Sequence, residues 1–183
     1  MLDTQNRGGG RKEFFPLDHD DIYLDTCALM EEGFRLWLRQ NLPELLKTGK
    51  KLVIPHAVEQ ELAYLAQGVA SNCCREAGRA RELARRLVQT GVAERRGDRT
   101  ISQQADLYLI KTASAERFGR RIAVITQDRQ LTRDLQLLNR IGSAKTIRTY
   151  KLEQGVLVST DRISCIPPNR ADNAAQIYRQ LNL

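Results

Sequence analysis

The sequence predicts an α/β fold with a central, mainly parallel sheet. Short apolar runs of strand length alternate with segments whose apolar residues recur at helical spacing, and the runs are 21–26, 51–54, 120–126 and 145–150. Strands that alternate with helices need crossover connections, and these place helices on the faces of a parallel sheet. With 183 residues, 42% of them hydrophobic, the chain can form one domain with its own core.

The segments around these strands complete the expected order of elements. The expected helices are 27–40, 42–48, a helix opened by Pro55, 71–89, 102–118 and 127–140. The segment 95–99 is expected to form a turn, and 156–159 to pair weakly at a sheet edge.

The chain is expected to divide into a central domain with two appended segments. Residues 1–18 predict a flexible basic arm, because Gly8–Gly10 cannot hold a helix. Residues 19–150 are the predicted domain. Residues 151–183 are expected to form an extension that packs on the domain or trails from it, with a small helix over 171–181 after Pro167 and Pro168.

The charge favours a polyanionic partner. The net charge is +7, from 29 basic and 22 acidic residues, and most of the basic residues are arginines, which contact phosphate in a bidentate manner. No apolar run is long enough to span a membrane, and no secretory signal is evident, so we expect no membrane partner. Four cysteines without paired spacing, beside two histidines, argue against zinc and predict reduced thiols in a cytoplasmic protein.

Four acidic residues lie where strands end or helices begin. Asp25 ends the first strand, Asp128 follows the third, and Glu61 and Asp106 lie early in two helices. In open α/β sheets ligands bind at the carboxyl ends of the strands, where we expect these side chains to meet. A divalent cation such as Mg²⁺ or Mn²⁺ would relieve their repulsion. Taken singly, Asp25 and Asp128 also fit helix caps.

The motifs resemble, in order, those of the PIN-domain nucleases over roughly residues 21–150. The resembling segments are Leu24-Asp-Thr26, 55–62 with Glu61, 105–113 with Asp106, and 124–131 with Thr126 and Asp128. The third motif departs from many relatives, which carry a doubled acid where this chain has the single Asp106. A second metal ion would therefore be held weakly. Asp134 could help to hold it, or could instead be a solvated partner of an arginine.

The resemblance implies a three-layer α/β/α PIN-like domain and a metal-dependent endoribonuclease, which hydrolyses RNA phosphodiester bonds with metal-activated water. It assigns metal binding to Asp25, Glu61, Asp106 and Asp128, and orientation of water or a ligand to Thr126. The RNA would be single-stranded or structured. A toxin-type, RNA-processing or defence role would fit, as would a homodimer or an inhibitory or targeting protein partner.

Arginines near these motifs are the candidate RNA contacts. Arg129 and Arg133 lie one turn apart beside Asp128, whereas Arg79 and Arg86 belong to the arginine-rich face of 71–89. For that face an ordinary solvated surface is the alternative. Aromatic residues are few, so the sequence does not predict recognition by base stacking.

Two other functions remain open from the same residues. A catalytically silent PIN-like module that binds RNA or protein is favoured by the single acid of the third motif. A structure-specific DNA nuclease would use the same metal chemistry. A doubly wound enzyme for phosphorylated small molecules is disfavoured, because no Gly-rich loop follows a strand.

Overall fold

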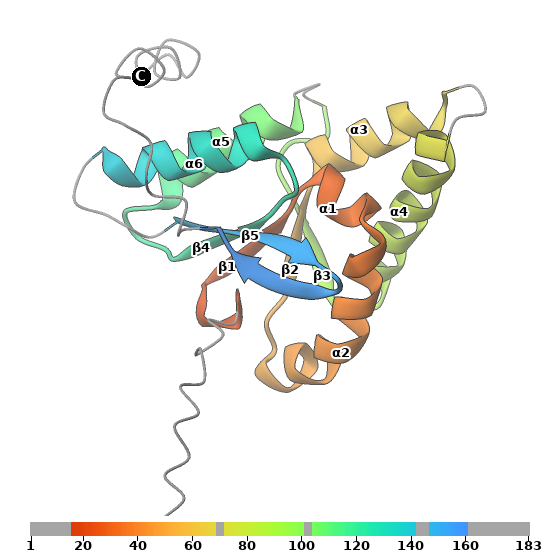
Figure 1. Ribbon diagram of the computed structural model, residues 1–183, viewed down its shortest axis with the longest axis horizontal. Helices are drawn as coiled ribbons and strands as arrows, with labels where there is room; N and C mark the ends of the chain where they lie inside the picture. The colour runs from red at the N-terminus through yellow and green to blue at the C-terminus, as the bar shows by residue number, and fades with distance from the viewer. Residues whose placement is uncertain (1–15, 69–71, 101–103, 142–146, 161–183) are drawn as a thin grey trace, which may run out of the picture.

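The computed structural model describes residues 16–68, 72–100, 104–141 and 147–160 (Figure 1). Its strands are β1 (Asp21–Leu24), β2 (Leu52–Pro55), β3 (Ala93–Arg96), β4 (Ile122–Ile125), β5 (Ile147–Glu153) and β6 (Val156–Ser159). Its helices are the 3-10 helix η1 (Pro16–Asp18), α1 (Thr26–Met30), α2 (Glu32–Thr48), α3 (His56–Ala66), α4 (Asn72–Gln89), α5 (Ala105–Glu116) and α6 (Arg129–Arg140).

All the strands of the described residues belong to one sheet, in the order β3-β2-β1-β4-β5-β6. The pairs from β3 to β5 are parallel, and β6 is antiparallel to β5 at the edge. The predicted α/β class and mainly parallel sheet are therefore confirmed. The edge pairing of 156–159 is confirmed as well.

Helices cover both faces of the sheet. Side chains alternate between the two faces along each strand, so each face carries apolar residues that pack against helices. Ile22 and Leu24 point into a core shared with α1, α2, α3 and α4, whereas Tyr23 points into a core shared with α5 and α6. Figure 1 shows α5 and α6 together on one side and α4 on the other. This arrangement is compatible with three α/β/α layers.

The prediction of helices over 27–40 and 42–48 was wrong about the position of the break. The chain leaves the helical conformation at Glu31, whose ψ is 128°, and α2 then continues to Thr48. Pro43 lies inside α2 at an exposed position, where it removes a single backbone donor and does not end the helix.

The prediction of a turn over 95–99 was partly wrong, because Arg95 and Arg96 belong to β3. Strand β3 is an edge strand, so its charged residues reach solvent or ion-pair partners instead of a core. The turn itself follows at Gly97, whose φ of 95° favours glycine.

Several expectations lie outside the described residues. These are the arm up to residue 15 and the terminal helix over 171–181. Nothing in the described ranges tests the proposed domain boundaries. Within those ranges no helix is long and apolar enough to cross a membrane.

Candidate metal and nuclease site

The carboxyl ends of β1 and β4 form the centre of the candidate site. Strand order reverses between these two strands, since β2 and β3 lie on one side and β5 on the other. Such a reversal opens a crevice at the strand ends, where ligands bind in open α/β sheets. Asp25 follows β1 and Thr126 follows β4, and the Asp25 backbone N–H donates to the Ile125 carbonyl at 3.1 Å.

Asp25 is held rigidly at this crevice. Its side chain is only 3% exposed. Oδ1 accepts the Thr26 backbone N–H at 2.7 Å, and Oδ2 accepts the Thr126 hydroxyl at 2.6 Å. Asp25 therefore does cap α1, and its second oxygen joins β1 to β4.

Cys27 is part of the same network, although the sequence did not single it out. Its thiol donates to Asp25 Oδ2 at 2.7 Å and lies 3.3 Å from the Thr126 hydroxyl oxygen. Its sulfur accepts the Gln127 backbone N–H at 3.0 Å. Burial, followed by the Asp25 charge, raises the pKa of Cys27 to about 12, so the group stays a neutral thiol. Its position two residues after Asp25 was the available signal.

Asp128 begins α6 and remains connected to Asp25 through Thr126. The Asp128 backbone N–H donates to the Thr126 hydroxyl at 2.9 Å. Asp128 Oδ1 accepts the backbone N–H groups of Gln130 and Leu131, at 2.5 and 2.9 Å. The carboxylate thus caps the helix with one oxygen, and its other oxygen takes no part in these bonds.

Glu61 reaches the site from α3. Although the residue is exposed, its Oε2 accepts the Thr26 hydroxyl at 2.7 Å. Thr26 directly follows Asp25, so this bond ties Glu61 to the end of β1. Thr26 is a second residue that the sequence reasoning did not assign.

Asp106, in the first turn of α5, is the fourth of the predicted acidic residues. Partial burial, followed by the negative charges of Asp25, Asp128 and Glu61 in that order, raises its pKa to about 6. Repulsion of this kind needs short separations. Asp25, Asp128 and Glu61 therefore lie within electrostatic range of Asp106, although the four residues belong to segments far apart in the sequence.

Helix α6 carries further charged residues close to Asp128 in the sequence. Asp134 accepts a hydrogen bond from the Gln130 side chain at 2.9 Å. Burial raises the pKa of Asp134 and the Asp128 charge adds to this, so Asp134 extends the acidic cluster. Arg129 and Arg133 are exposed, and the positive charge of Arg133 opposes the rise in the pKa of Asp134.

The two arginines predicted on α4 lie elsewhere. Arg86 forms an ion pair with Glu82 at 2.7 Å within the helix. Arg79 lies against the start of α2, where its carbonyl accepts a hydrogen bond from Arg35. No contact in the described part of the chain joins either residue to the carboxylates.

The carboxylate chemistry fits a hard divalent cation. An ionised carboxylate offers about four lone-pair positions. Asp25 uses three for the hydrogen bonds above, and no described donor bonds to Asp106. Among the described residues, however, no group of three acidic, histidine or cysteine side chains is placed so that it could hold a metal ion. The fit therefore rests on donor type alone, since Mg²⁺ and Mn²⁺ prefer oxygen ligands.

Comparison of the chain with protein-family models, with curated proteins and with solved structures gave no match.

Proposed function

We propose that this chain is a metal-dependent endoribonuclease with a PIN-like, three-layer α/β/α domain. The observation that carries the proposal is the gathering of Asp25, Glu61, Asp106 and Asp128 at the strand-order reversal. The negative charges of Asp25, Asp128 and Glu61 disfavour the ionised form of Asp106, and a fold that bears this cost favours a role that uses the charge. The net charge of +7 on the whole chain supports a polyanionic substrate.

Each residue of the site has its own role in this proposal. Asp25, Glu61, Asp106 and Asp128 would hold Mg²⁺ or Mn²⁺. Such an ion, when bound, activates water and neutralises charge on a phosphodiester. The Thr126 hydroxyl keeps one Asp25 oxygen in place. Arg129, the first residue of α6, adds positive charge to a helix N-terminus and is the best candidate to contact the phosphate.

The raised pKa of Asp106 has a specific meaning in this proposal. Without metal, part of the Asp106 population carries a proton near pH 6. Binding of a cation needs the ionised form, so metal affinity falls as the pH drops towards 6 and below. Cleavage limited by metal would follow the same dependence.

The direct test is a cleavage assay on matched oligonucleotides. A labelled single-stranded RNA and a DNA of the same sequence are incubated with the protein, in Mn²⁺ or in EDTA, beside the Asp25→Asn variant. We expect Mn²⁺-dependent cleavage of RNA, and loss of that cleavage in the variant. Equal cleavage by Asp25→Asn would refute the site, and cleavage of the DNA alone would change the substrate to DNA.

A catalytically silent binding module is the second candidate. It is favoured by the open arrangement of the carboxylates, which form no closed metal cage among the described residues. For this module RNA binding would survive EDTA, and no strand would be cut in Mn²⁺. The same assay, read alongside a binding measurement, separates the two functions.

A further inference from the structure

A basic groove lies between α3, α4 and the segment that follows β3. Its volume is about 710 Å³. The charged residues that line it include four arginines and two glutamates: Arg81, Arg85, Arg95, Arg99, Glu59 and Glu82. None of the four acidic residues of the candidate nuclease site lines it.

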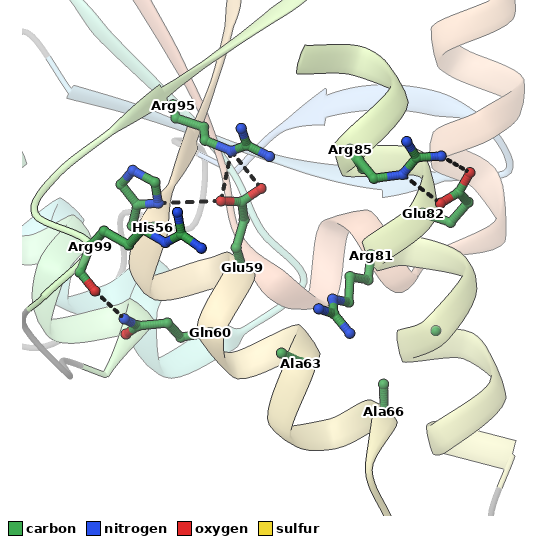
Figure 2. Close-up of a pocket in the computed structure, with 11 residues that line it drawn as sticks. His56, Glu59, Gln60, Ala63, Ala66, Arg81, Glu82, Arg85, Arg95 and Arg99 are labelled. Carbon is green, nitrogen blue, oxygen red and sulfur yellow. Dashed lines mark hydrogen bonds and ion pairs between the residues drawn. The ribbon is translucent and has the colours of Figure 1, made fainter. Parts of the chain in front are cut away.

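The arginines of this groove differ in how they are paired (Figure 2). Arg95 Nε donates to both carboxylate oxygens of Glu59, at 2.8 and 2.9 Å, and Arg85 binds Glu82. Figure 2 shows Arg81 extending from α4 toward α3. Within the described residues, the guanidinium groups of Arg81 and Arg99 have no ion pair or hydrogen bond. The groove therefore holds an excess of positive charge and two cations available to a ligand.

Small residues also line the groove. They are Ala63 and Ala66 of α3, which Figure 2 shows, and Gly78 of α4. A Cβ atom added at Gly78 would meet nothing within 4 Å. A chain of phosphates can approach such a surface closely, and the guanidinium fork suits phosphate oxygens.

The groove and the candidate nuclease site lie on different faces of α3. Residues of an α-helix are about 100° apart, so Glu61 lies nearly opposite Ala63 and Glu59. His56, the first residue of α3, lines the groove and contacts Glu59 at 3.3 Å. A strand bound in the groove could pass the start of α3 and continue to the carboxylates.

An exposed aromatic residue lies beside the groove. Tyr64 is 77% exposed and follows Gln60, a lining residue, by one turn of α3. Arginines that follow a backbone, next to an exposed aromatic ring, are typical of surfaces that bind single-stranded nucleic acid.

We propose that this groove binds the phosphodiester backbone of single-stranded RNA, as a site separate from the carboxylate cluster. The choice of RNA rests on the proposed function, whereas the affinity for an anionic strand rests on the groove's own charge. The groove holds the part of the strand that extends beyond the cleaved bond.

Gly78 offers a clean test of the groove. Gly78→Glu adds a negative charge where the structure leaves open space, and Gly78→Gln adds a side chain of the same size without charge. Both replacements are better helix formers than glycine, so both variants should fold. We expect Gly78→Glu to bind a labelled single-stranded RNA about tenfold more weakly than Gly78→Gln, measured by fluorescence anisotropy. Equal affinities would overturn the proposal.

The arginines supply an independent measurement. Arg81→Gln and Arg99→Gln should each lower the slope of log affinity against log salt concentration by about one, because each removes a phosphate contact. Arg140→Gln, an exposed arginine at the end of α6, removes the same charge outside the groove and should keep the slope. Equal slopes for all three variants would refute the site.

The binding and cleavage results separate the two proposals. Binding is measured in EDTA with the whole 183-residue chain, so it needs no nuclease activity. If Asp25→Asn abolishes cleavage while the Gly78 pair binds equally, the groove fails and the nuclease stands. If the chain cuts no RNA but Gly78→Glu weakens binding, the nuclease fails and the groove stands. Stronger competition by poly-glutamate or duplex RNA than by single-stranded RNA would overturn the proposed ligand.

Discussion

Thr126 is the residue on which the candidate site depends most for its shape. It is 1% exposed, and its hydroxyl both donates to Asp25 and accepts from the Asp128 backbone. We predict that Thr126→Val, which keeps the shape but removes the hydroxyl, lowers the free energy of unfolding by about 1–3 kcal/mol, because buried polar groups lose their partner. Urea unfolding in EDTA measures this.

Thr126→Ser is the matched control for that substitution, since it keeps the hydroxyl and removes only a methyl group. We expect it to remain closer to the wild type than Thr126→Val. Should the valine and serine variants unfold at the same urea concentration, the hydroxyl would contribute nothing to stability.

Asp106 makes stability depend on pH. Burial and neighbouring carboxylates raise its pKa from 3.8 to about 6, so the folded state favours the protonated form. This stabilising contribution is fully present below about pH 4 and is lost as the pH rises through about 6. We therefore predict that Asp106→Asn is more stable than the wild type at pH 7 without metal. The gain is about 1 kcal/mol or less, because the Asp106 side chain is only partly covered by protein and solvent screens its charge.

Thermal unfolding in EDTA across this pH range tests the prediction. The difference in Tm between Asp106→Asn and the wild type should shrink as the pH falls from 7 towards 4. A difference that is constant across the range would mean that Asp106 titrates normally in the folded chain.

Among single residues, the sequence predicted the acidic residues of the candidate site, but not the residues that form hydrogen bonds with them. Asp25 and Asp128 follow apolar runs whose strand character is evident, so their shared edge could be predicted. Thr26 and Cys27 could not be assigned in the same way. Their roles depend on Glu61 and Gln127, which the fold brings to them from 35 and 100 residues away.

At the scale of elements, the N-cap residue of α6, Asp128, is also a residue of the candidate site. Asp128 Oδ1 caps α6, and asparagine can accept the same two hydrogen bonds. We predict that Asp128→Asn keeps the stability of the wild type but loses cleavage, whereas Asp128→Ala loses cleavage and about 1 kcal/mol of stability. Unfolding and cleavage measured on both variants test this. Full cleavage by Asp128→Asn would remove Asp128 from the metal site.

The elements that the sequence missed share a physical cause. Strand β3 contains the charged residues Glu94, Arg95 and Arg96. An edge strand does not need two apolar faces, so β3 lacks the apolar run by which the other strands were predicted. The break at Glu31 lies between apolar residues that continue a helical pattern, so periodicity alone could not locate it. Strands β1, β2 and β4 are buried throughout and were predicted as apolar runs.

At the scale of the whole molecule, opposite charges are separated between two surfaces. Asp25 and Asp128 lie at the carboxyl ends of β1 and β4, with Asp106 in electrostatic range of both. The groove on the other face of α3 is lined by four arginines, and two of them, Arg81 and Arg99, have no ion pair among the described residues. The sequence showed an arginine-rich face on α4 but not its partner surface, because Arg95 and Arg99 reach the groove only when β3 pairs with β2. Such a separation can attract a polyanion to the groove and a cation to the acidic edge.

Metal binding should therefore stabilise the folded chain as a whole. A ligand that binds only the folded state at about 100 times its Kd contributes about 2.7 kcal/mol. For a chain of this size that is about 5–10 °C in Tm. We predict a shift of this order when Mn²⁺ replaces EDTA, and a much smaller shift for Asp25→Asn, as measured by thermal unfolding. Because protons compete for Asp106, the shift should also be smaller at pH 5 than at pH 7. Equal shifts in the wild type and Asp25→Asn would mean that Mn²⁺ binds elsewhere.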